Sequence, residues 1–76
     1  MSTYDSELDV RGLNCPLPIL KAKKALAGLK SGHVMKILTT DPGSVKDFEA
    51  FANQSDNELL ESSQVEDEYH FLLKKG

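Results

Sequence analysis

Short stretches of the chain alternate between apolar and polar residues, a period of two that is typical of β-strands with one buried face. Leu8 and Val10 fall on one side of the first stretch, and Tyr69, Phe71 and Leu73 fall on one side of the last. The second stretch is rich in β-forming residues, whereas the third is less regularly patterned. The expected strands are residues 6–10, 33–40, 58–65 and 69–74, with the last two paired antiparallel.

After the first strand, apolar residues recur at helical spacing. This helix is expected to begin at Cys15 or Pro16, because proline is tolerated in a first turn, where backbone N–H groups have no partner within the helix. It is expected to run to about Lys30 and to stop at Ser31 and Gly32. Five apolar residues share an arc of about 120° that should face the core: Ile19, Ala22, Ala25, Leu26 and Leu29.

A second, shorter amphipathic helix is expected over residues 45–54, which completes the order β-α-β-α-β-β. Two helices on one face of a four-stranded mixed sheet would bury both apolar stripes. The expected fold class is therefore an α/β (α+β) two-layer sandwich. A chain of 76 residues has room for one hydrophobic core, so we expect a single domain over residues 1–76.

Charge is distributed unevenly along the chain, although its net value is only −3. No acidic residue lies between Val10 and Thr40, whereas six of the nine basic residues lie there. One part of the surface is therefore expected to be basic, either as an ordinary solvated helix face or as a docking surface. The acidic balance argues against direct nucleic-acid binding, which needs clustered Lys and Arg.

No apolar run approaches the ~20 residues that a membrane helix needs. Residues 1–9 are polar and acidic, unlike a secretory signal. The single cysteine excludes an internal disulfide. The sequence therefore predicts a cytoplasmic protein with a free thiol and no membrane partner.

Cys15 is the candidate chemical centre, because it is the only thiol and lies at the expected start of a helix. A helix N-terminus lowers the pKa of a cysteine thiol and favours the nucleophilic thiolate. A nearby cation, Arg11 or Lys21, would favour the thiolate further. The alternative is that Cys15 is a small core residue, since free cysteine is among the most buried residue types.

Pro16 and Pro18 argue against that alternative, because a core cysteine has no need of two flanking prolines. Both prolines lack a backbone N–H group. The remaining amides of the first turn, such as that of Leu17, are therefore expected to have fewer competitors for the sulfur. The prolines also fix the turn, so that the sulfur has a defined direction.

Other cysteine chemistries lack their partners in this sequence. There is no second cysteine to resolve a disulfide, as a thioredoxin-like protein needs. His33 is expected at the far end of the first helix and His70 in the last strand, so neither is placed as a base for a hydrolase-like pair. One cysteine and two separated histidines do not match the ligand spacing of a zinc site. We therefore expect no metal, and there is no Gly-rich phosphate loop.

Ten consecutive residues around the cysteine form a distinctive run: Asp9-Val10-Arg11-Gly12-Leu13-Asn14-Cys15-Pro16-Leu17-Pro18. Together with Lys21, Asp41-Pro42 and Asp47, this run resembles the TusA/SirA family of sulfur carrier proteins, and the similarity covers nearly the whole chain. The Cys-Pro-x-Pro element at the start of the first helix is specific for that family.

The resemblance implies a two-layer α/β sandwich in which Cys15 accepts sulfane sulfur as a covalent persulfide, without a separate cofactor. The donor would be a cysteine desulfurase or a rhodanese-like protein, and the sulfur would pass to an acceptor protein. The family pattern assigns positioning roles to Asp9, Gly12, Pro16 and Pro18.

Branches of this family differ in where the sulfur goes. One branch supplies 2-thiouridine at the tRNA wobble position, and others serve sulfur oxidation or molybdenum-enzyme maturation. The members that thiolate tRNA carry an acidic residue between the two prolines, where this chain has Leu17. This departure leaves the pathway open.

The leading hypothesis is a sulfurtransferase-type carrier that acts stoichiometrically and as a monomer. Lys21 and Lys24, interleaved with Leu17 and Leu20 away from the core stripe, form its expected docking surface. Two other classes remain open: a redox sensor that cycles through sulfenic acid on Cys15, and a nucleic-acid-binding regulatory module on a small α/β sandwich.

Overall fold

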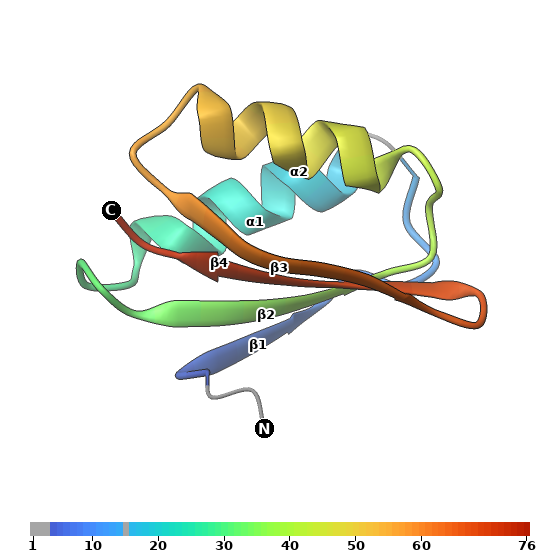
Figure 1. The fold of residues 1–76 in the computed structure, drawn as a ribbon, viewed down its shortest axis with the longest axis horizontal. Helices are drawn as coiled ribbons and strands as arrows, with labels where there is room; N and C mark the ends of the chain where they lie inside the picture. Colours follow the sequence, from blue (N-terminus) through green and yellow to red (C-terminus); the bar gives the residue numbers. More distant parts are fainter. Residues whose placement is uncertain (1–3, 15) are drawn as a thin grey trace.

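The computed structural model describes residues 4–14 and 16–76 (Figure 1). Strands and helices follow one another as β-α-β-α-β-β, which confirms the order predicted from the sequence. Their bounds are β1 (Ser6–Asp9), α1 (Leu17–Ala27), β2 (Val34–Thr39), α2 (Ser44–Asn53), β3 (Glu58–Val65) and β4 (Glu68–Lys74).

The four strands form one mixed sheet in the order β1-β2-β4-β3. β1 and β2 run parallel, with Leu8 opposite Ile37, and the chain passes between them through α1. β4 pairs antiparallel with β2 on one side and with β3 on the other. Both helices cover the same face of this sheet, so the predicted two-layer α/β sandwich is confirmed (Figure 1).

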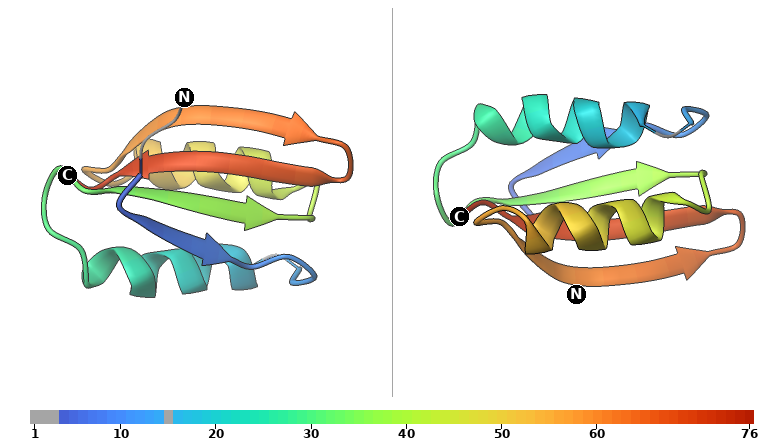
Figure 2. Two further views of the ribbon diagram at one scale, coloured as in Figure 1. Left: turned by 90° about the horizontal axis from the view of Figure 1, so that it is seen from below. Right: turned by 90° about the horizontal axis from the view of Figure 1, so that it is seen from above.

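The two helices lie over different parts of the sheet. α1 lies on the side of β1, whereas α2 lies over β4 and β3 (Figure 2). As a result, α1 and β3 are on opposite sides of the molecule. Within the described residues, neither helix has the length and apolar character needed to cross a membrane.

The core fills the space between the sheet and the helices. β2 contributes Met35 and Ile37, and β4 contributes Phe71 and Leu73, all at most 1% exposed. Phe48 of α2 packs on Phe71, with the ring centroids 4.9 Å apart. Tilted aromatic pairs at this distance add to the stabilisation that apolar burial supplies.

α1 buries the apolar stripe that its sequence predicts. Ala22 and Leu26 are fully buried, and the other three members of the stripe are partly buried against the core: Ile19, Ala25 and Leu29. Leu17 and Leu20, which fall outside the stripe, are 45% and 53% exposed. The helical periodicity therefore separated the core leucine from the surface leucines correctly.

The predicted length of this helix was wrong at its C-terminal end. α1 ends at Ala27 with Gly28 as its C-cap, because the next amides bond to carbonyls only three residues back: Gly28 N–H to Ala25 at 3.2 Å and Leu29 N–H to Leu26 at 3.0 Å. Gly32, the expected stop, has a φ of +90° and donates its N–H to the Lys75 carbonyl at 2.7 Å. Its left-handed conformation directs the chain into β2.

Candidate functional site

The loop that leads from β1 to α1 begins with a tight turn. The Leu13 N–H donates to the Val10 carbonyl at 3.3 Å, and Gly12 has a φ of +83°. This is the pattern of a type II turn, which favours glycine at its third position. Gly12 also donates its N–H to Thr40 Oγ1 at 2.9 Å, which ties the loop to the end of β2. The turn and this hydrogen bond fix the loop at Gly12, and the positioning role of Gly12 toward the cysteine stays a prediction.

Cys15 itself lies outside the described residues, but both of its neighbours are described. Pro16 is the N-cap of α1 and is exposed, whereas the Pro18 side chain is among the largest fully buried ones. The two prolines therefore differ: Pro18 anchors the first turn of α1 in the protein interior, and Pro16 lies at the surface beside position 15.

The Leu17 amide differs from the sequence prediction. Its N–H donates to the Asn14 carbonyl at 2.9 Å, so it already has a backbone acceptor and closes the turn that precedes α1. The expectation that this amide faces few competitors for the sulfur is therefore not supported. Its contribution is to the shape of the loop around position 15.

The N-terminus of α1 carries no acidic residue in its first turn, and no side chain of the described residues caps it. The oriented N–H groups of a first turn attract negative charge. An anion placed beside Pro16 would therefore meet the positive end of this helix without competition from an acidic first-turn side chain.

One exposed face of α1 combines apolar and basic side chains, as the sequence predicted. Leu17 and Leu20 are about half exposed, and Lys21 and Lys24 are exposed beside them on α1. A hollow of about 390 Å³ adjoins these lysines, lined also by Leu8 and Ala25. We call Leu17, Leu20, Lys21 and Lys24 the α1 face.

A second hollow, of about 210 Å³, is lined by Pro16 and by residues of α1 and α2. Ile19 and Phe51 supply apolar walls, and Lys23 lies with its Nζ 6.0 Å from the centre of the Phe51 ring. Asp47 also lines this hollow. This hollow could not be predicted from the sequence, because it depends on how the two helices pack.

Arg11 and Asp9 form a closely bonded pair at the end of β1. Asp9 Oδ1 accepts from the Arg11 backbone N–H at 3.1 Å and from Nε at 2.9 Å, and Oδ2 accepts from Nη2 at 2.8 Å. These hydrogen bonds from Arg11 lower the pKa of Asp9 from 3.8 to about 2. Such bidentate contacts fix the direction of both side chains.

The same guanidinium reaches across to the start of β4. Arg11 Nη1 donates to Glu68 Oε2 at 3.0 Å, and Glu68 Oε1 lies 3.0 Å from His70 Nε2. The hydrogen bond with His70 is the largest cause of a lowered pKa of Glu68, and the one with Arg11 is the next. The pKa of Arg11 is raised, first by its hydrogen bonds with Asp9 and next by the one with Glu68. Two carboxylates thus offset the charge of Arg11, and the role of this residue in stabilising a thiolate stays a prediction.

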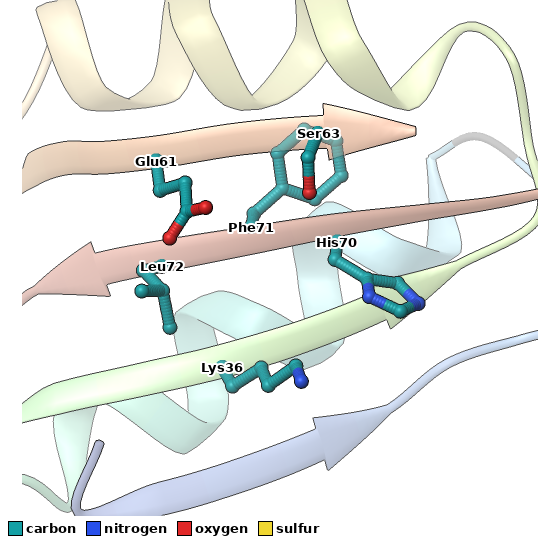
Figure 3. Close-up of a pocket in the computed structure, with 6 residues that line it drawn as sticks. All are labelled: Lys36, Glu61, Ser63, His70, Phe71 and Leu72. Atoms are coloured by element: carbon teal, nitrogen blue, oxygen red, sulfur yellow. The ribbon is translucent and has the colours of Figure 1, made fainter. Parts of the chain in front are cut away.

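A further pocket, of about 140 Å³, is lined by residues of β2, β3 and β4 (Figure 3). Its lining residues are Lys36, Glu61, Ser63, His70, Phe71 and Leu72. None of them belongs to the loop before α1 or to α1 itself, so this pocket is separate from the residues around position 15. Among residues 4–14 and 16–76, no group of three or more acidic or histidine side chains is placed to hold a metal ion.

Comparison with known proteins gives one consistent family. Residues 6–75 match the family described as Sulfurtransferase TusA. The chain is 59% identical over 76 residues to the sulfur carrier protein TusA of Allochromatium vinosum, with all of both chains covered. It is 48% identical over 67 residues to a putative sulfur carrier protein of Neisseria meningitidis, covering 88% of this chain and 90% of that one.

A solved structure agrees with this assignment. The crystal structure of a SirA-like protein from Desulfitobacterium hafniense superposes with a TM-score of 0.76 and is 28% identical, covering 95% of this chain and 99% of that chain. The family match spans nearly the whole chain, the two relatives match over 90% or more of their own length, and the solved structure shares the fold. The chain therefore belongs to the TusA family of sulfur carrier proteins, as the residues around Cys15 predicted.

Proposed function

We propose that this protein carries sulfane sulfur as a persulfide on Cys15, taking it from a protein donor and delivering it to a protein acceptor. The observation that carries the proposal is the position of the only cysteine of a TusA-family chain, directly before a helix whose first turn has no acidic side chain. The donor is a cysteine desulfurase or a rhodanese-like protein.

The transfer is a thiol–persulfide exchange. The Cys15 thiolate attacks the terminal sulfur of the donor persulfide, a new S–S bond forms on Cys15, and the old S–S bond breaks to release the donor thiolate. The acceptor thiolate later attacks the terminal sulfur on Cys15 in the same way. The chain thus needs neither a second cysteine nor a metal to complete its part.

The surroundings of position 15 support this chemistry. The positive end of α1 favours a thiolate or a persulfide anion over the neutral thiol. Exposed Pro16 and Leu17 leave the start of the helix open to a partner, while buried Pro18 holds that start in place. An exposed start of the helix that is held in place from below suits successive docking to two partners.

The α1 face is the surface that we propose for partner contact. Leu17 and Leu20 offer an apolar contact next to position 15, and Lys21 and Lys24 surround it with positive charge. Apolar side chains at the centre of an interface contribute most of the affinity, and charges at the rim steer association. A donor with acidic residues around its persulfide loop fits this surface.

Mass spectrometry of the intact protein tests the proposal. Incubation with a cysteine desulfurase and cysteine should add about 32 Da to the chain, and a reductant should remove it. Cys15→Ser should gain nothing under the same conditions. An unchanged mass with every desulfurase and rhodanese tried, combined with sulfenic-acid trapping at Cys15 after peroxide treatment, would support a redox sensor instead.

The α1 face has its own test. Lys21→Glu with Lys24→Glu should slow donor-dependent persulfidation of Cys15 by about tenfold, because reversed charges oppose a steered encounter. Lys30→Glu, with an exposed lysine beyond the end of α1, serves as the control and should leave the rate unchanged. Equal rates for all three proteins would exclude the α1 face as the docking surface.

We propose 2-thiouridine of tRNA as the destination of the sulfur, with sulfur oxidation or molybdenum-enzyme maturation as the alternative. Leu17 is the residue that bears on this choice, because the family members that thiolate tRNA carry an acidic residue at this position beside the cysteine. Removal of the gene from its host should lower 2-thiouridine in digested tRNA, and the wild-type gene should restore it. Unchanged 2-thiouridine would favour the alternative.

A further inference from the structure

We propose that the outer side of β3 is a second docking surface, which takes an extended, lysine- or arginine-rich segment of a protein partner as a fifth strand of the sheet. The surface consists of strand β3 itself and of a hollow at its first residues, and we call it the β3 edge. It lies away from α1, so its binding activity does not depend on Cys15.

β3 contributes little to the core of this protein. Leu59 is its one partly buried residue, and the rest of the strand is exposed. Leu60 and Val65 are 45% and 51% exposed and belong to the large apolar side chains that the fold leaves on the surface. A strand that buries so little of itself has apolar area available for a partner.

The backbone of β3 is also available. β3 is the last strand in the order β1-β2-β4-β3, so the described residues place a strand on one side of it only. A bulge between Leu59 and Glu61 disrupts its first part, but residues 61–65 then pair one-to-one with β4. These five residues span roughly 17 Å and include neither lysine nor proline, the residues with which edge strands commonly block pairing.

A hollow of about 480 Å³ continues this surface at the junction of α2 and β3. Its lining includes the carboxylates Glu49, Asp56 and Glu58 and the amides Asn53 and Asn57. Neither lysine nor arginine lines it. A hollow of this size and charge accommodates a lysine or arginine side chain, with carboxylates to accept its N–H groups.

The charge around the β3 edge decides which occupant fits it. Between residues 47 and 73 the chain has no lysine or arginine. The acidic residues next to the β3 edge are Glu49, Asp56 and Glu58 in the hollow and Glu66 and Asp67 in the turn that follows β3. A second copy paired through β3 would bring these carboxylates toward one another, whereas a basic segment complements them. The occupant is therefore a basic partner strand.

Helix α1 and strand β3 lie on opposite sides of the molecule (Figure 2). A partner bound at the β3 edge therefore leaves the start of α1 open. Together with the proposed function, this arrangement lets one partner hold the carrier while another exchanges sulfur with Cys15. Extended peptides that add a strand to a sheet edge are a recurring mode of recognition.

NMR with isotope-labelled protein tests the β3 edge. The probe is a blocked synthetic peptide of alternating lysine and valine, and a peptide of alternating glutamate and valine is its control. The lysine peptide should shift the amide signals of residues 56–67 saturably, and the glutamate peptide should not. Shifts that fall mainly on α1, or none at all, would overturn the proposal.

Charge-reversed variants separate a specific surface from a general charge effect. Glu58→Lys should weaken binding of the lysine peptide by about fivefold, as the loss of a close charge pair does. Glu7→Lys, which makes the same charge change at an exposed position of β1, is the control and should bind almost normally. Equal weakening by both variants would contradict the proposal.

Two further measurements complete the test. Cys15→Ser should bind the lysine peptide like the wild type, so a failure of the sulfur-carrier proposal leaves this result unaffected. Sedimentation should show no self-association through β3. A dimer that the lysine peptide dissociates would show that the occupant is a second copy, and it would overturn the choice of a basic partner.

Discussion

Replacing Pro18 with alanine tests whether the second proline of the Cys-Pro-Leu-Pro element anchors α1. The Pro18 side chain is buried to less than 2% exposure. The substitution removes two buried ring carbons, at about 0.8 kcal/mol each. It also gives the unfolded chain more freedom, which costs roughly 0.4–1 kcal/mol. The sum is a loss of about 2–2.5 kcal/mol in the free energy of unfolding.

Pro16→Ala is the matched control. Pro16 is exposed, so its replacement loses only the effect on the unfolded chain, about 0.4–1 kcal/mol. Urea unfolding followed by circular dichroism gives both free energies, provided that the dependence on urea concentration is the same for all three proteins. For a domain of this size, about 2 kcal/mol corresponds to a fall in Tm of roughly 8–16 °C. Equal losses for the two variants, or a larger loss for Pro16→Ala, would refute the division of roles between the prolines.

Three other predictions concern the loops and the ion pairs. Gly12→Ala should lower the free energy of unfolding by about 1–2 kcal/mol, because Gly12 has a φ of +83°. An added Cβ would meet no neighbouring atom, so backbone strain is the only cost. An unchanged urea midpoint would contradict this prediction. Glu66→Gly should raise stability by roughly 0.5–1 kcal/mol, because Glu66 has a φ of +56°; a lower midpoint would argue against strain at that turn. NMR titration should give Asp9 a pKa of about 2, and Arg11→Ala should return it toward 3.8. Since the folded-state pKa is the lower one, the stabilisation is present above pH 3.8 and lost as the pH falls toward 2; an Asp9 pKa that does not change in the variant would exclude the Arg11 contact.

Local periodicity was sufficient to predict the elements and the face that α1 buries. Leu26 was expected in the core and Leu17 and Leu20 on the surface, and the exposed fractions agree. The position of a residue on a helix follows from spacing alone, so no long-range information was needed. The end of α1 was less predictable, because the chain has two glycines that could end the helix, Gly28 and Gly32, and the periodicity does not choose between them.

Contacts between distant residues could not be predicted in the same way. Arg11 was considered only as a cation for the thiolate, and the sequence pattern did not show that its guanidinium bonds to Glu68, a residue 57 positions away. That contact depends on how the strands are ordered and aligned in the sheet, which the alternating pattern does not specify. The Leu17 amide was likewise expected to have few competitors for the sulfur, whereas it donates its N–H to the Asn14 carbonyl.

The third expected strand has a less regular pattern than the other three. Its alternation is weak because the strand buries only Leu59 and carries a bulge next to it. Core burial therefore does not account for the residues that follow. A docking role of the β3 edge explains both this irregular pattern and the acidic composition of residues 47–73.

Cyanolysis of the loaded protein tests the central claim most directly. The chain is incubated with a cysteine desulfurase and cysteine, separated from both, and treated with cyanide, which removes sulfane sulfur as thiocyanate. We predict about one thiocyanate per chain for the wild type and none for Cys15→Ser, because a persulfide on the single thiol is the only carried group. A yield of zero from wild-type protein loaded by an active donor, or an equal yield from the serine variant, would contradict a persulfide on Cys15.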